Sequence, residues 1–199
     1  MIGYFGNADA LAAVGTNGEI IALVVTLSSG LSIGANVLTA KKIGEKSPEK
    51  IPAILHTSIA FALLAGILGM VCGICIASPL LSVIRTPARV MAPAKLYLKL
   101  YFLNVPFLLL YDFGSAILRA RGDSRFPFLA LTISGIVNVL LNLCFVVGFH
   151  TGVSGVAVAT DLSTVLSASM VLYRLHKDPG VFHLSLRQLQ IDRNCLCGR

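Results

Sequence analysis

Two asparagines are spaced so that they could bind a small cation inside an apolar stretch. Asn138 and Asn142 stand four residues apart in the run NVLLN, so a helix places both on one face. Amide oxygens are ligands for hard cations. Asn side chains also form hydrogen bonds between membrane helices, without any ligand. The spacing alone leaves both interpretations open.

Two carboxylates lie in similarly apolar surroundings. Asp112 stands seven residues before Arg119, about 10 Å along a helix from the nearest charged residue that comes after it. Asp161 comes after the run VAVAT and is further from any basic residue. A carboxylate at such a position pairs with another group, takes up a proton or binds a cation. We regard both as candidate proton or substrate contacts, with structural pairing as the alternative.

The elements that carry these residues are predicted to be membrane-spanning helices. The chain is 56% hydrophobic and only 13% charged. Residues 51–84 and 126–160 contain no Asp, Glu, Lys or Arg, and about 20 apolar residues suffice for one crossing of a bilayer. A soluble domain of 199 residues has too little outer layer to bury several such helices. The sequence therefore predicts an all-α polytopic membrane protein.

Five spans can be placed along the chain. We predict helices over residues 19–40, 51–84, 92–118, 127–149 and 153–173. Pro106 is expected to bend the third, and the glycines of GLSIG at 30–34 are expected to allow close helix packing. Cys72 and Cys75 are interpreted as buried small residues rather than a redox or zinc pair.

The basic residues predict the orientation of the spans. Twelve of the 16 fall on one side, which includes residues 41–50, 119–125 and the region after 173, and four fall on the other. Since Lys and Arg are retained in the cytoplasm, the first side is expected to be inside, with the amino terminus outside and the carboxyl terminus cytoplasmic. One cytoplasmic loop then contains Arg119, Arg121, Asp123 and Arg125, with Gly122 as a left-handed helix end. A solvated turn is the simplest interpretation of this loop.

The composition also argues against several functions. The net charge of +7 does not form a basic face, so no nucleic acid is expected as a partner. The sequence contains no nucleophile with its base, no phosphate-binding loop and no metal quartet. We therefore expect neither an enzyme nor a cofactor, and no metal beyond a possible Na⁺.

An ordered set of segments resembles the multidrug and toxic compound extrusion (MATE) family of secondary transporters. These segments are ALAAVG at 10–15, GLSIGANVLTAKKIG at 30–44, TPARV at 86–90, YLKLYF at 97–102, YDFGSAILRARGDSRFP at 111–127, NVLLN at 138–142 and GVSGVAVAT at 152–160. They occur in the family's order and spacing, over roughly residues 3–178.

The resemblance implies a fold of twelve helices in two six-helix lobes. It also implies antiport in the plasma membrane, in which H⁺ or Na⁺ entry drives export of small organic, often cationic, compounds. The family's cation site in the first lobe maps here to Asn138, Asn142 and Thr160. Its central carboxylate, an Asp on the first helix, has no counterpart in this chain.

That departure leads us to expect a partial lobe. Residues 1–178 are interpreted as helices two to six of the amino-terminal lobe, and residues 179–199 as a cytoplasmic tail that stops before the second lobe. The missing first helix and second lobe of the same protein are then its partners, together with the lipid bilayer. Two alternatives stay open: a lipid-linked saccharide flippase of the related superfamily, and a scaffold or decayed fragment that transports nothing.

Overall fold

The computed structural model describes residues 15–149 and 151–184, and every regular element in these ranges is helical. The elements are α3 (Gly18–Gly44), the 3₁₀ turn η1 (Pro48–Lys50), α4 (Ile51–Val83), α5 (Ala88–Leu103), α6 (Val105–Ala120), α7 (Arg125–Leu143), the π-helical turn η2 (Cys144–Gly148) and α8 (Gly152–His176). The predicted all-α class is confirmed.

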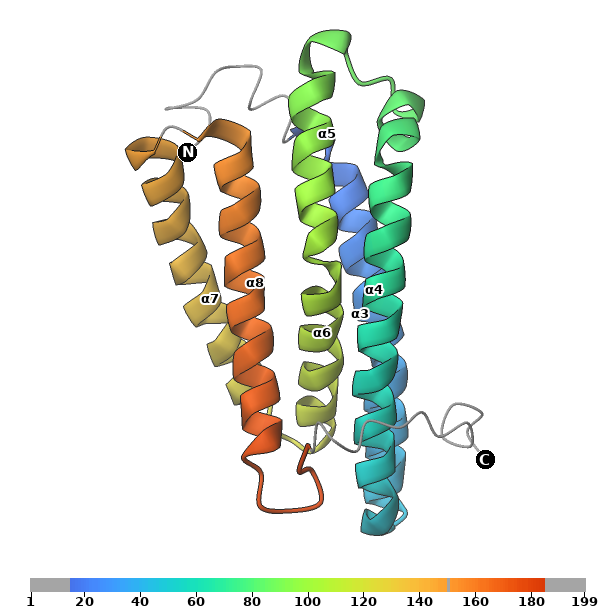
Figure 1. Ribbon diagram of the computed structural model, residues 1–199. Coiled ribbons are helices and arrows are strands. Elements are labelled where there is room, and N and C mark those ends of the chain that lie inside the picture. The colour runs from blue at the N-terminus through green and yellow to red at the C-terminus, as the bar shows by residue number, and fades with distance from the viewer. Residues whose placement is uncertain (1–14, 150, 185–199) are drawn as a thin grey trace.

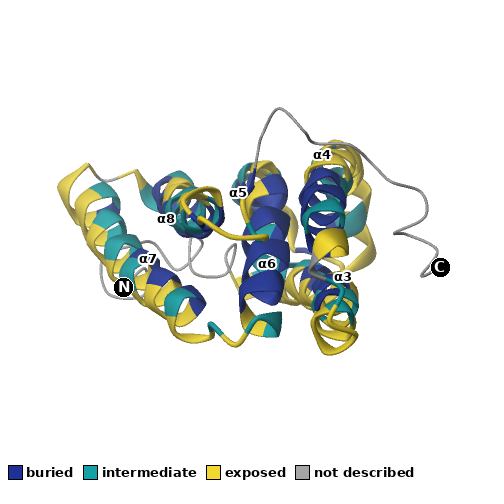
Figure 2. Cartoon of the chain, turned by 90° about the horizontal axis from the view of Figure 1, so that it is seen from below, coloured by how far each residue is buried: buried dark blue, intermediate teal, exposed yellow. Residues whose placement is uncertain are grey.

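Helix α6 is the centre of the bundle. Figure 1 shows α7 and α8 on one side of it and α3 and α4 on the other. α6 packs against α3, α4 and α8, whereas α7 packs mainly against α8. Its segment from Phe113 to Leu118 is buried throughout, and the end-on view in Figure 2 shows the buried faces of the flanking helices turned toward it.

The third predicted span is broken into two helices at Asn104. α5 and α6 meet there at an angle of 43°. Pro106 has no N–H to donate to the backbone carbonyl four residues earlier, so the helix cannot continue regularly through this point. The predicted bend near Pro106 is confirmed, and the break turns the side chain of Asn104 toward α8.

Glycines set the distance between helices on α4 but not on α3. A Cβ atom on Gly66 of α4 would lie 2.5 Å from Pro106 Cα, and one on Gly73 would lie 2.1 Å from the ring of Phe102. These two glycines let α4 approach α5 and α6. Around Gly30 and Gly34 of α3 no described residue lies within 4 Å, so GLSIG sets no helix distance among the described helices, contrary to the prediction.

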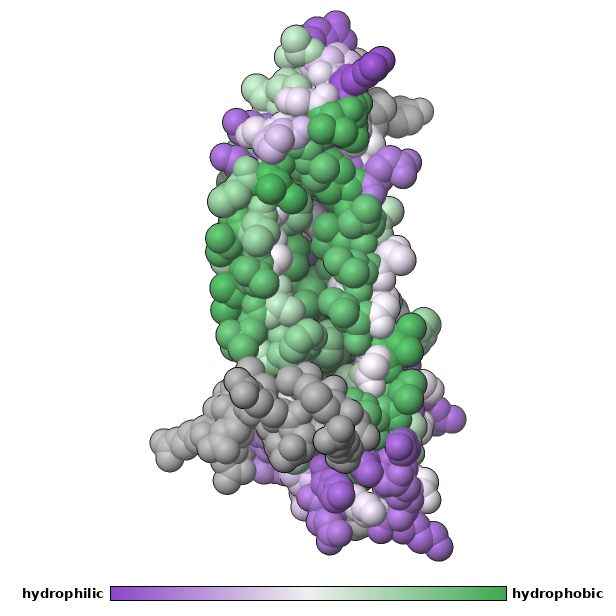
Figure 3. Space-filling view, turned by 90° about the vertical axis from the view of Figure 1, so that its right-hand side faces the viewer, coloured by the Kyte–Doolittle hydropathy of each residue, from purple (hydrophilic) through white to green (hydrophobic). Residues whose placement is uncertain are grey.

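The outer surface is that of a multi-span membrane protein. Four helical segments are each long and apolar enough to cross a bilayer: α3, α4, α7 together with η2, and α8. The bent α5–α6 pair makes a fifth span if the pair counts as one. Figure 3 shows hydrophobic side chains over the middle of the face formed by α3 and α4, with hydrophilic side chains at its ends. Cys72 and Cys75 are exposed on α4, so their predicted burial is wrong.

Candidate functional site

The interface between α7 and α8 brings Asn138, Asn142 and Thr160 together. Asn138 Nδ2 donates to Thr160 Oγ1 at 3.5 Å and to Ser163 Oγ at 3.1 Å. Asn142 Nδ2 donates to Asn138 Oδ1 at 3.0 Å and to the backbone oxygen of Asn138 at 2.9 Å. We call Asn138, Asn142, Thr160 and Ser163 the α7–α8 cluster. The i, i+4 spacing of the asparagines is what allows both to face α8.

The hydrogen bonds continue from this cluster to the break between α5 and α6. Ser163 Oγ donates to the backbone oxygen of Thr160 at 2.8 Å, and Thr164 Oγ1 donates to the same oxygen at 3.0 Å. Asn104 Nδ2 in turn donates to Thr164 Oγ1 at 3.2 Å. Asn104, Ser163 and Thr164 were not among the residues predicted from the sequence. The signal was present, since the two hydroxyls come after Thr160 at helical spacing and Asn104 precedes a mid-span proline.

Three buried oxygens in this region have no hydrogen-bond partner within the described ranges: Asn104 Oδ1, Asn142 Oδ1 and Asp161 Oδ1. A buried polar atom without a partner costs about 1–3 kcal/mol. A cation at Asn142 Oδ1, or a proton or cation at Asp161, would remove that cost. Among the residues predicted from the sequence, Asn142 and Asp161 are the two that present such an oxygen.

Asp161 and Thr160 face different neighbours although they are adjacent in the sequence. Thr160 Oγ1 accepts from Asn138 on α7. The Asp161 carboxylate instead lies near Tyr97 and Tyr101 of α5. Successive residues of a helix point about 100° apart, so the two side chains do not converge on one ion.

Asp112 lies apart from the α7–α8 cluster, on the side of α6 that faces α3. Its Oδ2 accepts hydrogen bonds from Ser28 Oγ at 2.6 Å and from Ser29 Oγ at 3.5 Å. Asp112 is therefore paired within the bundle by hydroxyl groups, as the structural alternative predicts. Across residues 15–149 and 151–184, no three His, Cys, Asp or Glu side chains converge in a way that could hold a metal ion.

Comparison with known families identifies the bundle. The model of the MatE family matches residues 1–144 of the 199. The chain belongs to the MatE family. Among curated relatives, it is 29% identical over 202 aligned residues to the probable multidrug resistance protein YoeA of Bacillus subtilis, covering 98% of this chain and 44% of the relative. It is 31% identical over 153 residues to Protein DETOXIFICATION 42 of Arabidopsis thaliana, covering 74% of this chain and 30% of that protein.

Solved structures show the same fold for this MatE chain. A crystal structure of MATE in the bent conformation superposes with a TM-score of 0.89 at 24% identity, over 96% of this chain and 43% of that one. An inward-facing conformation of a MATE family transporter gives a TM-score of 0.87 over the same shares. The MatE chain thus spans less than half of the length of these relatives and structures.

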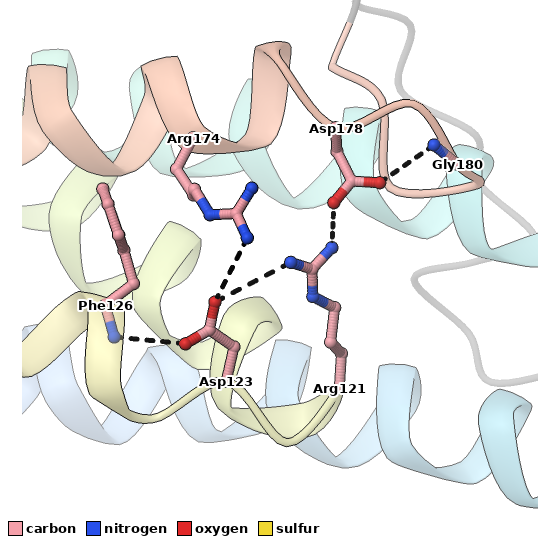
Figure 4. A network of polar contacts seen from close by, with 6 residues as sticks. All are labelled: Arg121, Asp123, Phe126, Arg174, Asp178 and Gly180. Atoms are coloured by element: carbon pink, nitrogen blue, oxygen red, sulfur yellow. Dashed lines mark hydrogen bonds and ion pairs between the residues drawn. The ribbon is translucent and has the colours of Figure 1, made fainter.

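The loop between α6 and α7 of the MatE chain is a packed ion-pair network rather than only a solvated turn. Arg121 pairs with Asp178, just beyond α8, and its other nitrogen lies 3.7 Å from Asp123 Oδ2. Asp123 also lies 3.8 Å from Arg174 of α8 and accepts from the Phe126 N–H at 3.1 Å. Figure 4 shows Arg121 and Asp123 joining the loop to the end of α8.

The backbone of this loop adopts the predicted turn. Gly122 has the left-handed φ of 92° that was expected. Its N–H donates to the backbone oxygen of Arg119, and the Asp123 N–H donates to that of Leu118, which closes α6. Arg119 and Arg125 remain exposed. The position of the loop is therefore as predicted, whereas Arg174 and Asp178 were not predicted as partners of its charges.

Electrostatics within the network favour the charged state of Asp178. Partial burial would raise the pKa of this carboxyl group, but hydrogen bonds from Arg121 and from the Gly180 N–H, with the charges of Arg121 and Arg174, outweigh burial and hold the pKa below its ordinary value. The Asp178 side chain is only 10% exposed. The network therefore ties the α6–α7 loop to α8 at neutral pH.

Proposed function

We propose that the whole protein containing this chain is a secondary antiporter that exports small organic, cationic compounds in exchange for H⁺ or Na⁺. The observation that carries the proposal is the α7–α8 cluster, a hydrogen-bonded polar group within membrane-spanning helices of a MatE-family chain. Intramembrane polar groups are costly and commonly mark ion or substrate paths. The names of relatives such as YoeA and the multidrug export protein MepA of Staphylococcus aureus support the same class of substrate.

In this proposal the α7–α8 cluster is the coupling site. Asn142 Oδ1 and Thr160 Oγ1 supply neutral oxygen ligands, while Asn138 holds both side chains in place through its own hydrogen bonds. Because all of these ligands are uncharged, the cluster attracts a cation less strongly than one with a carboxylate. We therefore favour protons as the coupling ion, taken up by the carboxylate that the family carries on its first helix in the whole protein, with Asp112 or Asp161 assisting.

Binding of the coupling ion is proposed to favour one facing state of an alternating-access cycle. Two lobes would rock around a central cavity, and a cation that binds one state better than the other shifts their populations. The excess of basic residues at the end that contains the α6–α7 loop supports placing this end in the cytoplasm of a plasma-membrane protein.

The test is transport by the whole protein with Asn138→Ala in the cluster. Export of an organic cation such as ethidium should slow, and its dependence on the ion gradient should change, because Asn138 links Thr160 and Asn142. Thr132→Ala is the matched control on α7, since the hydroxyl of Thr132 only donates to the backbone oxygen of Phe128 in its own helix. Unchanged export and unchanged ion dependence in Asn138→Ala would rule out this site. A saccharide flippase would leave ethidium export at background in every variant.

A further inference from the structure

A groove between α3 and α4 lies on the opposite side of α6 from the α7–α8 cluster. α3 and α4 contact each other much less than each contacts α6, so the two helices are splayed over α6. The groove between them encloses about 220 Å³ and is lined by residues that include Leu31, Gly34 and Leu38 of α3 and Ile54 of α4, with Phe113 of α6. Figure 3 shows this face as two ridges of hydrophobic side chains with a recess between them.

The groove has the depth of one lipid leaflet. Leu38 precedes Lys42 by about 6 Å along α3, and Leu31 precedes it by about 16 Å. Half of a hydrocarbon core of about 30 Å is about 15 Å. Gly34 has no side chain and no described neighbour within 4 Å of its ideal Cβ position, so the groove stays open between Leu31 and Leu38. Its shape and lining suit an acyl chain.

A second, basic pocket lies at the end of the same two helices. It is an open surface pocket of about 410 Å³, lined by Lys42, Lys46 and Arg121, with apolar walls from Ile43, Ile51 and Phe182. Ile43 lies about 8 Å beyond Leu38 on α3, and Ile51 about 5 Å before Ile54 on α4. The basic pocket therefore lies within about two helical turns of the apolar groove.

The charges of the basic pocket leave room for an anion. Lys42 Nζ lies 2.5 Å from Glu45 Oε2, and Arg121 pairs with Asp178. Lys46 forms no ion pair with any residue of the described ranges, and none of the described residues that line the pocket carries a carboxylate. Phe182 stacks against the Arg121 guanidinium at 5.3 Å from the ring centroid. Lys46 therefore supplies the positive charge of the pocket that no described carboxylate balances.

The backbone at Lys46 is also held in an uncommon conformation. Lys46 has a φ of 53°, in the left-handed region, where glycine is the usual residue after a helix. Its N–H donates to the backbone oxygen of Ile43, and the Ser47 N–H donates to that of Lys42, which closes α3. A lysine in this position carries a conformational cost that glycine would avoid, and it adds a cation to the pocket.

We propose that the groove and the basic pocket together bind one anionic phospholipid. The phosphate lies between Lys42, Lys46 and Arg121, and one acyl chain occupies the groove along Leu31, Gly34 and Leu38. The site would recognise a lipid headgroup whose phosphate diester is not balanced by a positive charge on the same lipid. This site is separate from the α7–α8 cluster. Its lining comes from α3, α4, Phe113 of α6, the loops after α3 and α6 and the segment after α8, and it includes no residue of the cluster.

The test measures lipid binding to the purified full chain in detergent by native mass spectrometry, with no ion gradient present. Phosphatidylglycerol should bind more tightly than phosphatidylcholine with the same chains. Lys46→Gly should weaken phosphatidylglycerol binding about fivefold, since a basic residue near a membrane surface contributes about that factor. This variant also relieves the left-handed backbone, so its loss of binding does not come from misfolding. Lys41→Gln is the control, because it removes one positive charge, as Lys46→Gly does, from a residue of α3 that does not line the pocket.

A second pair of variants tests the acyl chain. Gly34→Leu fills the groove and should weaken phosphatidylglycerol binding, whereas Gly30→Leu, at an equally open position outside the groove lining, should not. Equal binding of the two lipids, or wild-type binding by both Lys46→Gly and Gly34→Leu, would overturn the proposal. The proposal would also be overturned if inorganic phosphate competed with phosphatidylglycerol while Gly34→Leu bound the lipid as wild type does. The pocket would then bind a soluble phosphate rather than a lipid.

Discussion

Asn142 donates to both the side-chain and the backbone oxygen of Asn138, at 3.0 and 2.9 Å, while its own Oδ1 accepts no hydrogen bond within the described residues. The amide nitrogen is therefore fully engaged on the helix, and the amide oxygen is held in a fixed direction without a partner. A fixed, buried oxygen is a ready ligand for a cation, because little conformational entropy is lost when the ion binds.

Replacing Asn142 by Asp should make export more dependent on Na⁺. A carboxylate at this position adds a negative charge next to Thr160 and Asn138, so Na⁺ should bind more tightly. The measurement is ethidium export by the whole protein at a range of Na⁺ concentrations and at fixed pH. The concentration of Na⁺ for half-maximal export should fall at least about tenfold, equivalent to about 1.4 kcal/mol. An unaltered Na⁺ dependence would contradict the assignment of Asn142 as a ligand.

Asp161 should matter more for coupling than Asp112. Asp161 Oδ1 is buried without a hydrogen-bond partner in the described structure, whereas Asp112 Oδ2 is paired with the hydroxyl of Ser28. Asp161→Asn should therefore reduce export driven by a pH gradient, and Asp112→Asn should affect folding or expression more than the response to pH. Export rates at several gradients, normalised to the amount of folded protein, distinguish the two effects. A larger loss of pH response in Asp112→Asn would reverse the assignment.

The ion pair between Arg121 and Asp178 should stabilise the bundle by about 1 kcal/mol, as expected for a partly buried, charge-assisted hydrogen bond. Because the folded-state pKa of Asp178 is lowered, this contribution is fully present above the ordinary carboxyl pKa of about 4 and is lost as the pH falls through the lowered value. Asp178→Asn should thus lower the Tm at pH 7 and leave it closer to wild type near pH 3.

Thermal unfolding of the two proteins across this pH range checks the prediction. Glu49→Gln, on the exposed turn η1, is a control that removes one carboxylate without touching the network. A difference in Tm between wild type and Asp178→Asn that stays constant with pH would show that the carboxylate does not titrate as argued.

Gly66→Ala should destabilise the fold where Gly30→Ala does not. The added Cβ at position 66 would lie 2.5 Å from Pro106 Cα, a backbone atom that cannot move aside without shifting α6. Overpacking of this kind costs about 1–3 kcal/mol. At position 30 the same substitution meets open space and gains helix propensity of up to about 1 kcal/mol. Thermal unfolding of both variants should move the Tm in opposite directions, and equal Tm values would refute the close approach of α4 and α6.

Hydropathy and residue spacing were enough to predict the local features of the fold. The long uncharged runs required membrane helices, and the i, i+4 spacing of Asn138 and Asn142 required a shared face. Pro106 and Gly122 each impose a local backbone geometry, so the bend and the loop could be predicted as well. These properties depend on residues that are close together in the chain.

The features that were missed depend on which helices become neighbours. Nothing in the sequence around Arg121 shows that Asp178 comes within reach of it, because that contact requires α6 and α8 to pack side by side. In the same way, Gly30 and Gly34 have the spacing of a packing motif, yet no described residue approaches either glycine. The reason is that α3 and α4 pack mainly against α6 rather than against each other. Asn104 reaches the hydrogen bonds that extend from the α7–α8 cluster because the third span breaks at this residue.

The most direct test of the account is ion-driven export by the whole protein in liposomes, comparing wild type with the double variant Asn138→Ala, Asn142→Ala. An imposed H⁺ or Na⁺ gradient should drive ethidium movement by wild type. In the double variant this rate should be at least about tenfold lower, equivalent to about 1.4 kcal/mol, while the protein remains folded. Movement at the wild-type rate, with the same ion dependence, would show that the α7–α8 cluster is structural and that coupling occurs elsewhere.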